Sequence, residues 1–227
     1  MVDKKKVTKT IIGILVFLFL AMSAYVSYSG ITWSDTDLSS VFYSTGRFAG
    51  LLGFLGIFVL VFVGETGKLF AMIFEKEKVM KFKNEISFGT LLVALLHPIF
   101  FILSSTSMAR LLLPNFSALP VAMGAIGLYI VVAMHLAFRF AKYMPKFVWK
   151  IIHPGTYVLF FMIFYHAINA TSYSDFLGMR IMYWTAFVLI VLAIIYRNQD
   201  KLRNRNVDAK KPKVPSKSKK TVKKKRK

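Results

Sequence analysis

Four histidines are the residues of this chain best suited to chemistry, and all of them lie within apolar segments or at their ends: His97, His135, His153 and His166. An ionisable side chain inside a membrane is costly and therefore usually has a function. Neutral imidazole binds haem iron, and a b-type haem held between two helices needs one histidine from each helix at the same depth. The depth of each histidine therefore decides which pair can bind one iron.

The composition places most of the chain in lipid. Of its 227 residues 56% are hydrophobic and only 18% are charged. A water-soluble domain of this length cannot bury so much apolar material, which excludes a soluble enzyme and a simple nucleic-acid binder. The chain has no cysteine. This excludes disulfides, iron–sulfur clusters and cysteine nucleophiles, so any redox chemistry must come from a bound cofactor.

Six segments are apolar enough to cross a membrane, which takes roughly 17–25 residues. Their approximate bounds are 11–27, 46–64, 86–105, 120–138, 154–170 and 181–196. We therefore expect an all-α integral membrane protein with a six-transmembrane-helix bundle over residues 11–196. The first segment, which follows three lysines, also has features of a signal peptide, but its length favours a membrane anchor.

Basic residues define the orientation of these segments. All but three of the 31 Lys and Arg residues lie in the N-terminus (1–10), in the 68–83 and 139–150 loops, or in the tail from 197 to 227. Because such residues are retained in the cytoplasm, we expect both termini to be cytoplasmic and the protein to be a multi-pass protein of the plasma or inner membrane.

The polybasic tail, residues 197–227, is expected to be disordered because it has little apolar area to bury. Its charge favours anionic lipid headgroups or an acidic partner, at about 1 kcal/mol per basic residue near the surface. A topology anchor that also keeps the chain soluble is the alternative. Nucleic acid is not an expected partner, because the lysine run has no interleaved aromatic residues.

Residue counts along the expected helices place His97 and His166 at the same depth in the membrane. Their helices both begin at the cytoplasmic side, near residues 86 and 154, so the two residues lie roughly 17 and 18 Å into the membrane at about 1.5 Å per residue. We therefore predict that they are the axial ligands of one haem in the outer half of the bilayer. The alternative is that each is an interhelical hydrogen-bonding residue without a metal.

His135 and His153 both lie near the cytoplasmic edge, where they form a candidate pair for a second, inner haem. Pro154 argues against this pair, because the residue before a proline is pushed out of helical geometry. His153 is then better interpreted as a residue that caps the start of the fifth helix.

Two weaker features accompany the histidines. Arg47 and Arg110, on the non-cytoplasmic side, are candidate partners of haem propionates, although arginine at a membrane boundary usually contacts headgroups. The second helix carries a stripe of small residues that favours close helix packing over contact with a flat macrocycle. This stripe consists of Gly46, Ala49, Gly50 and Gly53. No internal repeat is evident, and no arrangement of side chains suggests hydrolysis, so no catalytic residue is predicted.

Several short motifs occur in a characteristic order along residues 44–196. They are Ser44-Thr45-Gly46-Arg47, Lys81-Phe82-Lys83-Asn84 with Gly89 before His97-Pro98, Gly124-Ala125-Ile126-Gly127, and Trp149-Lys150-Ile151-Ile152-His153 followed by Tyr157 and His166. In these motifs the chain resembles the ferric reductase-like transmembrane domain family. Its likeness is closest to the small haem-binding membrane subunit of the bacterial methionine sulfoxide reductase system.

The resemblance implies a six-helix bundle that carries b-type haem and moves electrons across the membrane. It implies ligand roles for His97, His153 and His166. Family members with two haems have a further histidine about four turns before the residue that corresponds to His97. Here that position reads Lys83-Asn84. One haem is therefore expected, and a second only if His135 replaces the missing ligand.

The larger reductases of the family carry a flavin and nicotinamide domain that this chain lacks. The expected donor is thus a separate cytoplasmic reductase, free reduced flavin such as FMN, or quinol, and the expected acceptor is extracytoplasmic. FMN or quinone would bind only transiently. Two other functions remain: a haem-free six-helix scaffold or small channel or transporter, and a quinol-oxidising cytochrome b subunit of a larger complex.

Overall fold

The computed structural model describes residues 17, 20, 21, 23–25, 27, 28, 37–170 and 177–210, with the backbone alone at a few positions that include His153. All regular structure in these residues is helical. From residue 37 onward the α-helices are α2 (Leu38–Glu65), α3 (Gly67–Ile73), α4 (Lys76–Ser104), α5 (Leu119–Arg139), α6 (Lys146–Asn169) and α7 (Leu177–Lys210). Short 3-10 helices cover Thr106–Leu112, Phe116–Ala118 and Ala141–Tyr143.

Four helical segments of the described chain are long and apolar enough to span a membrane, so this is a membrane protein. They are Leu38–Glu65, Lys76–Ser104, Phe116–Arg139 and Leu177–Asp200. Most of the first expected span, residues 11–27, lies outside the described residues. The fifth expected span lies in α6, which is not one of the four. The first half of α6 contains Lys146, Lys150, His153 and Pro154 among its apolar residues.

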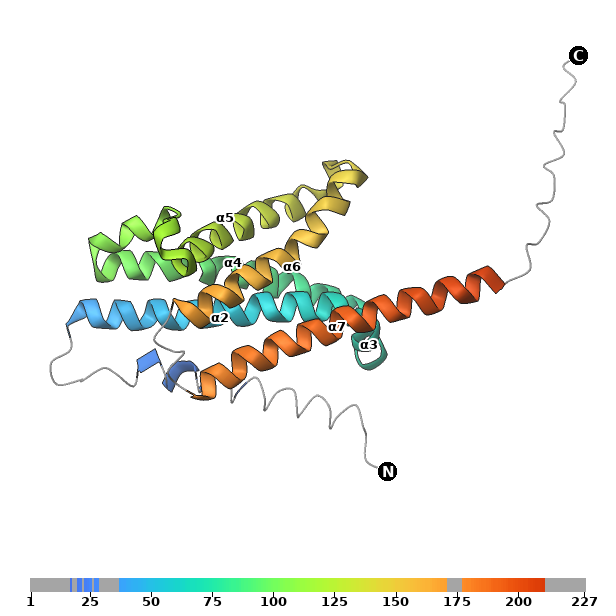
Figure 1. The fold of residues 1–227 in the computed structure, drawn as a ribbon, viewed down its shortest axis with the longest axis horizontal. Coiled ribbons are helices and arrows are strands. Elements are labelled where there is room, and N and C mark those ends of the chain that lie inside the picture. Colours follow the sequence, from blue (N-terminus) through green and yellow to red (C-terminus); the bar gives the residue numbers. More distant parts are fainter. Residues whose placement is uncertain are drawn as a thin grey trace, which may run out of the picture.

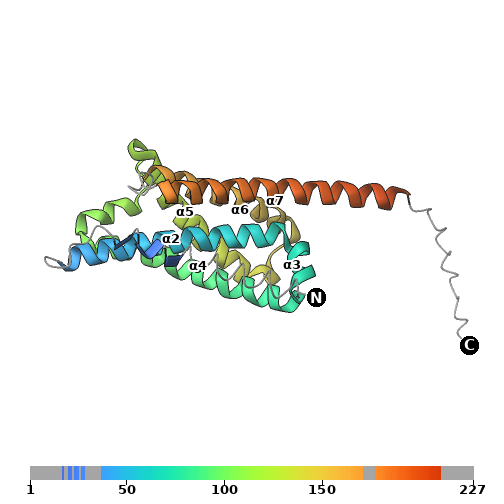
Figure 2. The same ribbon diagram turned by 90° about the horizontal axis from the view of Figure 1, so that it is seen from below.

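Helix α2 lies in the centre of the bundle, with α4 on one side and α7 on the other (Figures 1 and 2). It packs most extensively on α4, which runs antiparallel to it. Gly53 of α2 faces Ala94 of α4, where an added Cβ would lie 3.9 Å from the Ala94 Cα. One turn further along, the side chain of Thr90 occupies the space that a side chain on Gly56 would need. The glycines of α2 thus permit close helix packing, as predicted for this stripe.

Aromatic side chains join α2 to α6 and α7. Phe54 of α2 packs against Phe160 of α6, and its ring meets Tyr183 of α7 edge-on with the ring centroids 4.9 Å apart. Phe54, Phe160 and Tyr183 are all buried. Helix α5 packs mainly on α6. The described bundle therefore contains two helix pairs, α2 with α4 and α5 with α6, and α7 covers the seam between α2 and α6.

Ion pairs join α7 to α2 and α3 at the end of the bundle opposite Leu38. The guanidinium of Arg197 pairs with the carboxylate of Glu65, and it also donates a hydrogen bond of 3.0 Å to the Tyr157 hydroxyl of α6. Three residues further along each segment, Lys68 pairs with Asp200. The Glu65 side chain is only 3% exposed, whereas that of Lys68 is 61% exposed. Loss of the Arg197–Glu65 pair would therefore leave a buried carboxylate without its charged partner, which is costly.

Three helices begin well before the residues that the sequence predicted. Helix α2 begins at Leu38 rather than near residue 46, α4 at Lys76 rather than near 86, and α6 at Lys146 rather than near 154. Hydropathy marks only the part of a helix that lies in lipid, and backbone hydrogen bonding continues beyond it, through serine and threonine in α2 and through charged residues in α4 and α6. Because α6 passes through Pro154, the interpretation of His153 as a capping residue is wrong.

The last helix is also longer than predicted. Helix α7 continues to Lys210, beyond the other helices (Figure 1), so the assignment of residues 197–210 to a disordered tail is wrong. Lys, Arg, Gln and Leu in this stretch favour helix, and the first proline after residue 177 is Pro212. Residues 211–227 of the predicted tail, and residues 1–10 of the predicted N-terminal segment, lie outside the described residues.

The two ion pairs are expected to differ in their contribution to stability. Arg197→Met leaves the Glu65 carboxylate buried without its partner and should lower the free energy of unfolding by about 3 kcal/mol. Lys68→Met removes a largely exposed pair and should cost under about 1 kcal/mol. Unfolding of the purified protein in detergent, followed by circular dichroism, measures both. Equal losses in the two variants would contradict the expectation, and Glu65→Gln added to Arg197→Met should restore part of the loss.

Candidate functional site

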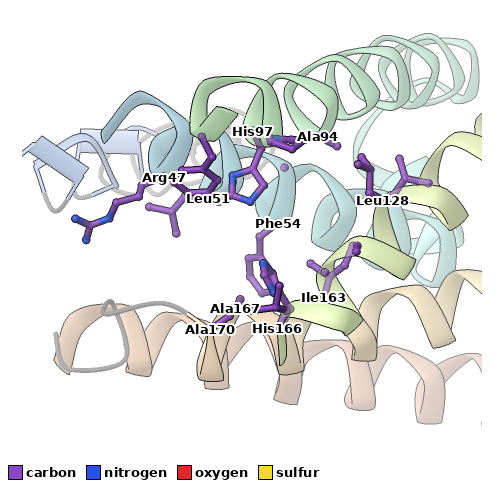
Figure 3. A pocket seen from close by; sticks show the side chains of 18 of the residues that line it. Arg47, Leu51, Phe54, Ala94, His97, Leu128, Ile163, His166, Ala167 and Ala170 are labelled. Carbon is purple, nitrogen blue, oxygen red and sulfur yellow. The ribbon is translucent and has the colours of Figure 1, made fainter. Parts of the chain in front are cut away.

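His97 of α4 and His166 of α6 face each other inside the bundle. Their ring centroids lie 6.4 Å apart, and their ring planes are inclined at 79°. Figure 3 shows the two rings on opposite walls of one pocket. The two imidazoles thus lie at one level of the bundle, as the residue counts along the two expected spans predicted.

The ring of His97 is held by the neighbouring helix α2. Its Nδ1 lies 2.7 Å from the carbonyl oxygen of Gly46. A carbonyl oxygen only accepts, so Nδ1 carries the hydrogen and donates it, and Nε2 keeps its lone pair. The ring also lies against Gly50, where an added Cβ would come within 2.7 Å of the ring atoms Nδ1 and Cε1. Helix α2 therefore supplies both the acceptor and the room for this imidazole.

The ring of His166 is held in the same way by helix α5. Its Nδ1 lies 2.8 Å from the carbonyl oxygen of Pro120, which again makes Nδ1 the donor and leaves the lone pair on Nε2. An added Cβ at Gly124 would come within 2.6 Å of Nδ1 and Cε1 of this ring. Within the described part of the chain, the Nε2 atoms of both histidines have no hydrogen-bonding partner.

The two half-sites share one local pattern. In each, the accepting carbonyl is followed four residues later by the glycine that lies against the ring, Gly50 or Gly124. Three residues further along, Gly53 faces Ala94 and Gly127 faces Ile163, which stand three residues before His97 and His166 respectively. The sequence alone showed no internal repeat, and the structure corrects this: the α2–α4 and α5–α6 pairs repeat the same contacts.

The pocket between the rings is mainly apolar. Besides the two histidines, its lining includes Phe54, Leu128 and Tyr183, together with several small residues of α2 and α5. Arg47 lines the pocket as well, and its guanidinium turns away from the imidazoles (Figure 3). The guanidinium carbon of Arg47 lies 5.8 Å from the centroid of the Tyr43 ring, on the preceding turn of α2. One cation therefore borders an otherwise apolar space.

The other predicted site residues lie elsewhere. Arg110 is exposed in the 3-10 helix Thr106–Leu112 and does not line the pocket. His135 of α5 lies beside Phe88 of α4, with ring centroids 6.4 Å apart, and its buried Nδ1 has no hydrogen-bonding partner in the described residues. His153 lies within α6, and its side chain is outside the described residues. The structure thus brings together His97, His166 and Arg47, and it separates Arg110 and His135 from them.

The described residues contain no cluster of three or more His, Asp or Glu side chains that could by itself enclose a metal ion. Two histidines can complete the ligand set of a metal that already has other ligands. His97 and His166 therefore do not by themselves enclose a bare metal ion.

Sequence reasoning did not identify the residues that hold the two rings. Both acceptors are backbone carbonyls, which carry no side-chain signal, and each lies on a different helix from its histidine. The signal that was present is the spacing Gly50-x-x-Gly53 and Gly124-x-x-Gly127. The sequence shows this spacing only as a pattern of small residues. The histidine ring that Gly50 or Gly124 contacts lies about 40 or more residues away along the chain, so the contact could not be predicted.

No family model, no curated protein and no solved structure matches this chain.

Proposed function

We propose that this protein is a membrane electron carrier that binds one b-type haem between His97 and His166. The observation that carries the proposal is the spacing and orientation of the two imidazoles. Each has its Nδ1 hydrogen bonded to the helix behind it and its Nε2 without a partner in the described structure. A histidine that binds a metal characteristically donates its other ring N–H to such a backbone carbonyl.

The spacing supports the proposal quantitatively. A metal–imidazole bond of about 2.0–2.1 Å, with about 1.1 Å from the nitrogen to the ring centre, separates two opposed ring centres by about 6.3 Å. The observed separation of the ring centroids is 6.4 Å. The separation of the two rings would thus be compatible with one iron held by both histidines. When bound, the iron takes up and releases one electron.

The chain supplies the ligands, their orientation and an apolar surround. The cavity wall formed by Phe54, Leu128 and Tyr183 keeps the site at a low dielectric constant. Arg47 stands at the margin of the pocket, where a carboxylate on the edge of the macrocycle, rather than its centre, would lie. We therefore assign the propionate-pairing role to Arg47 and not to Arg110.

Charged side chains at the opposite end of the bundle favour one haem rather than two. Lys83 stands 14 residues before His97, about 21 Å along α4. It lies within electrostatic range of Glu65 and Arg197, and an added Cβ on Gly64 would lie 4.0 Å from its Nζ. Charged side chains thus gather at the level where a second haem would lie. His135 has no hydrogen-bonding partner for its Nδ1 comparable to those of the proposed ligands, so we do not assign it a ligand role.

The proposed topology has six spans with both termini in the cytoplasm. The distribution of basic residues supports it, because the three exceptions, Arg47, Arg110 and Arg180, all lie on the same side of the six expected segments. Electrons would pass from a cytoplasmic reductase, reduced flavin or quinol to an extracytoplasmic acceptor. The polybasic segment after residue 210 would lie near anionic headgroups of a plasma or inner membrane.

A haem-free scaffold or channel is the competing function, in which the two imidazoles only join neighbouring helices. The hydrogen bonds to Gly46 and Pro120 fit that function equally well. It gives no reason, however, for two imidazoles with unpartnered Nε2 atoms to lie on opposite walls of one pocket with their ring centroids 6.4 Å apart. This difference makes the haem spectrum the discriminating measurement.

Protein purified from haem-replete cells should show a Soret band and a reducible α band, with one haem per chain. His97→Ala and His166→Ala should each lower the haem content by more than about tenfold, because an axial ligand is lost. His135→Ala is the matched control and should keep the wild-type content. A folded, colourless wild-type protein would refute the proposal. Two haems per chain, or loss of haem in the control, would refute the assignment of a single site.

Substitution of the two arginines tests the orientation of the macrocycle. Arg47→Gln should weaken haem retention severalfold, because it removes the cation at the margin of the pocket, whereas Arg110→Gln should leave retention unchanged. Transfer of haem to excess apomyoglobin, followed by absorbance, measures both rates. If the two variants lose haem equally fast, Arg47 does not pair with the propionates.

The electron donor can be identified with the same preparation. Reduced FMN, a flavin reductase with NADH, and a short-chain quinol would each be mixed anaerobically with the ferric protein while the α band is followed. Rapid reduction by quinol in the absence of any flavin would favour a quinol-oxidising subunit, and reduction only by flavin would favour a soluble reductase as the partner.

A further inference from the structure

The two imidazole planes are inclined at 79°, close to a right angle. An imidazole on a free side chain rotates about its Cβ–Cγ bond with broad preferences, so this angle needs a cause. In a bound haem, the macrocycle itself would leave each axial ring free to turn about the metal–nitrogen bond. The cause must therefore lie in what touches the two rings from behind.

Two contacts restrict each ring. The hydrogen bond from Nδ1 to a carbonyl of the neighbouring helix fixes the direction of one ring edge. The second contact is with a glycine: Nδ1 and Cε1 lie so near the backbone that an added Cβ would be 2.7 Å away at Gly50 and 2.6 Å away at Gly124. Real side-chain contacts of Cβ atoms are longer than 3.0 Å, so any other residue would force the ring to turn or to withdraw.

Neither glycine is explained by an unusual backbone. Both lie within regular helices, and no glycine in the described residues has a positive φ. A glycine in a helix interior costs roughly 0.5–1 kcal/mol relative to alanine. Gly53 shows the ordinary case, because an added Cβ there would meet Ala94 at 3.9 Å, a normal van der Waals distance. Gly50 and Gly124 differ from Gly53 because the group packed closely against each of them is a histidine ring.

We infer that Gly50 and Gly124 are positioning residues that, together with the carbonyls of Gly46 and Pro120, fix the two imidazole planes nearly at right angles before haem binds. This inference rests on the proposed function. The chain, rather than the cofactor, then determines how the two ligand π systems are oriented about the iron. Perpendicular axial rings interact with different iron d orbitals, and this brings those orbitals close in energy, whereas parallel rings separate them.

The first test needs no haem. The full chain, labelled with ¹⁵N-histidine and prepared from haem-depleted cells, should show His97 and His166 protonated at Nδ1 in NMR spectra, with assignments from His97→Phe and His166→Phe. Gly50→Ala should shift the signals of His97 and leave those of His166 in place, and Gly124→Ala should do the reverse. Gly53→Ala, on the same helix as Gly50, is the control and should shift neither.

The second test is the electron paramagnetic resonance spectrum of the ferric protein. The wild type and Gly53→Ala should give the strongly anisotropic low-spin signal, with one large g value, that near-perpendicular imidazoles produce. In Gly50→Ala the signal should move toward the rhombic form of more nearly parallel rings, at unchanged haem stoichiometry. An unchanged signal in both Gly50→Ala and Gly124→Ala would overturn the positioning role.

The outcomes separate the inference from the function on which it rests. If the wild type binds no haem, the proposed function fails, while the NMR test still reports whether the glycines orient the rings. If haem binds but the variants change neither spectrum, only the inference fails. If both glycine variants lose the fold while Gly53→Ala keeps it, the two glycines serve helix packing alone, and the positioning role is again refuted.

Discussion

The hydrogen bond between an imidazole and a backbone carbonyl of the next helix is the constraint on which the site depends. In lipid a polar ring without a partner is costly, so an acceptor close by stabilises His97 and His166. His97 finds it on α2 and His166 on α5. Each bond joins one helix pair and, at the same time, decides which ring nitrogen carries the hydrogen. Helix association and the chemical state of the ring are thus set by one interaction.

The backbone carbonyls become reachable only because the helices approach closely. Small residues in α2 let α4 lie near enough for Nδ1 of His97 to reach an oxygen that already belongs to the helical hydrogen-bond ladder. A carbonyl has two lone pairs, so it can serve both the ladder and the imidazole. A larger residue in place of Gly50 would separate the ring from its acceptor, and the loss of packing and the loss of ring orientation would then occur together.

The sequence predicted the parts of the fold that depend on hydropathy. The fourth expected span, 120–138, agrees with α5 to within a residue at each end, because apolar residues fill that helix from end to end. The starts of α2, α4 and α6 were missed by eight to ten residues, because polar residues extend these helices beyond their apolar parts. The common level of His97 and His166 followed from counting along two helices that run in the same direction. The contacts of Gly46 and Pro120 did not, since they join residues 51 and 46 positions apart.

The length of α7 extends the molecule beyond the end of the bundle at which Arg197 lies. Beyond Arg197, which is anchored to α2, the helix continues for 13 residues, or about 20 Å. A flexible chain of that length would let whatever follows it sample a wide volume, whereas a helix acts as a stiff spacer of fixed reach. Lys210, the last residue of the helix, is therefore held at a fixed distance from the bundle.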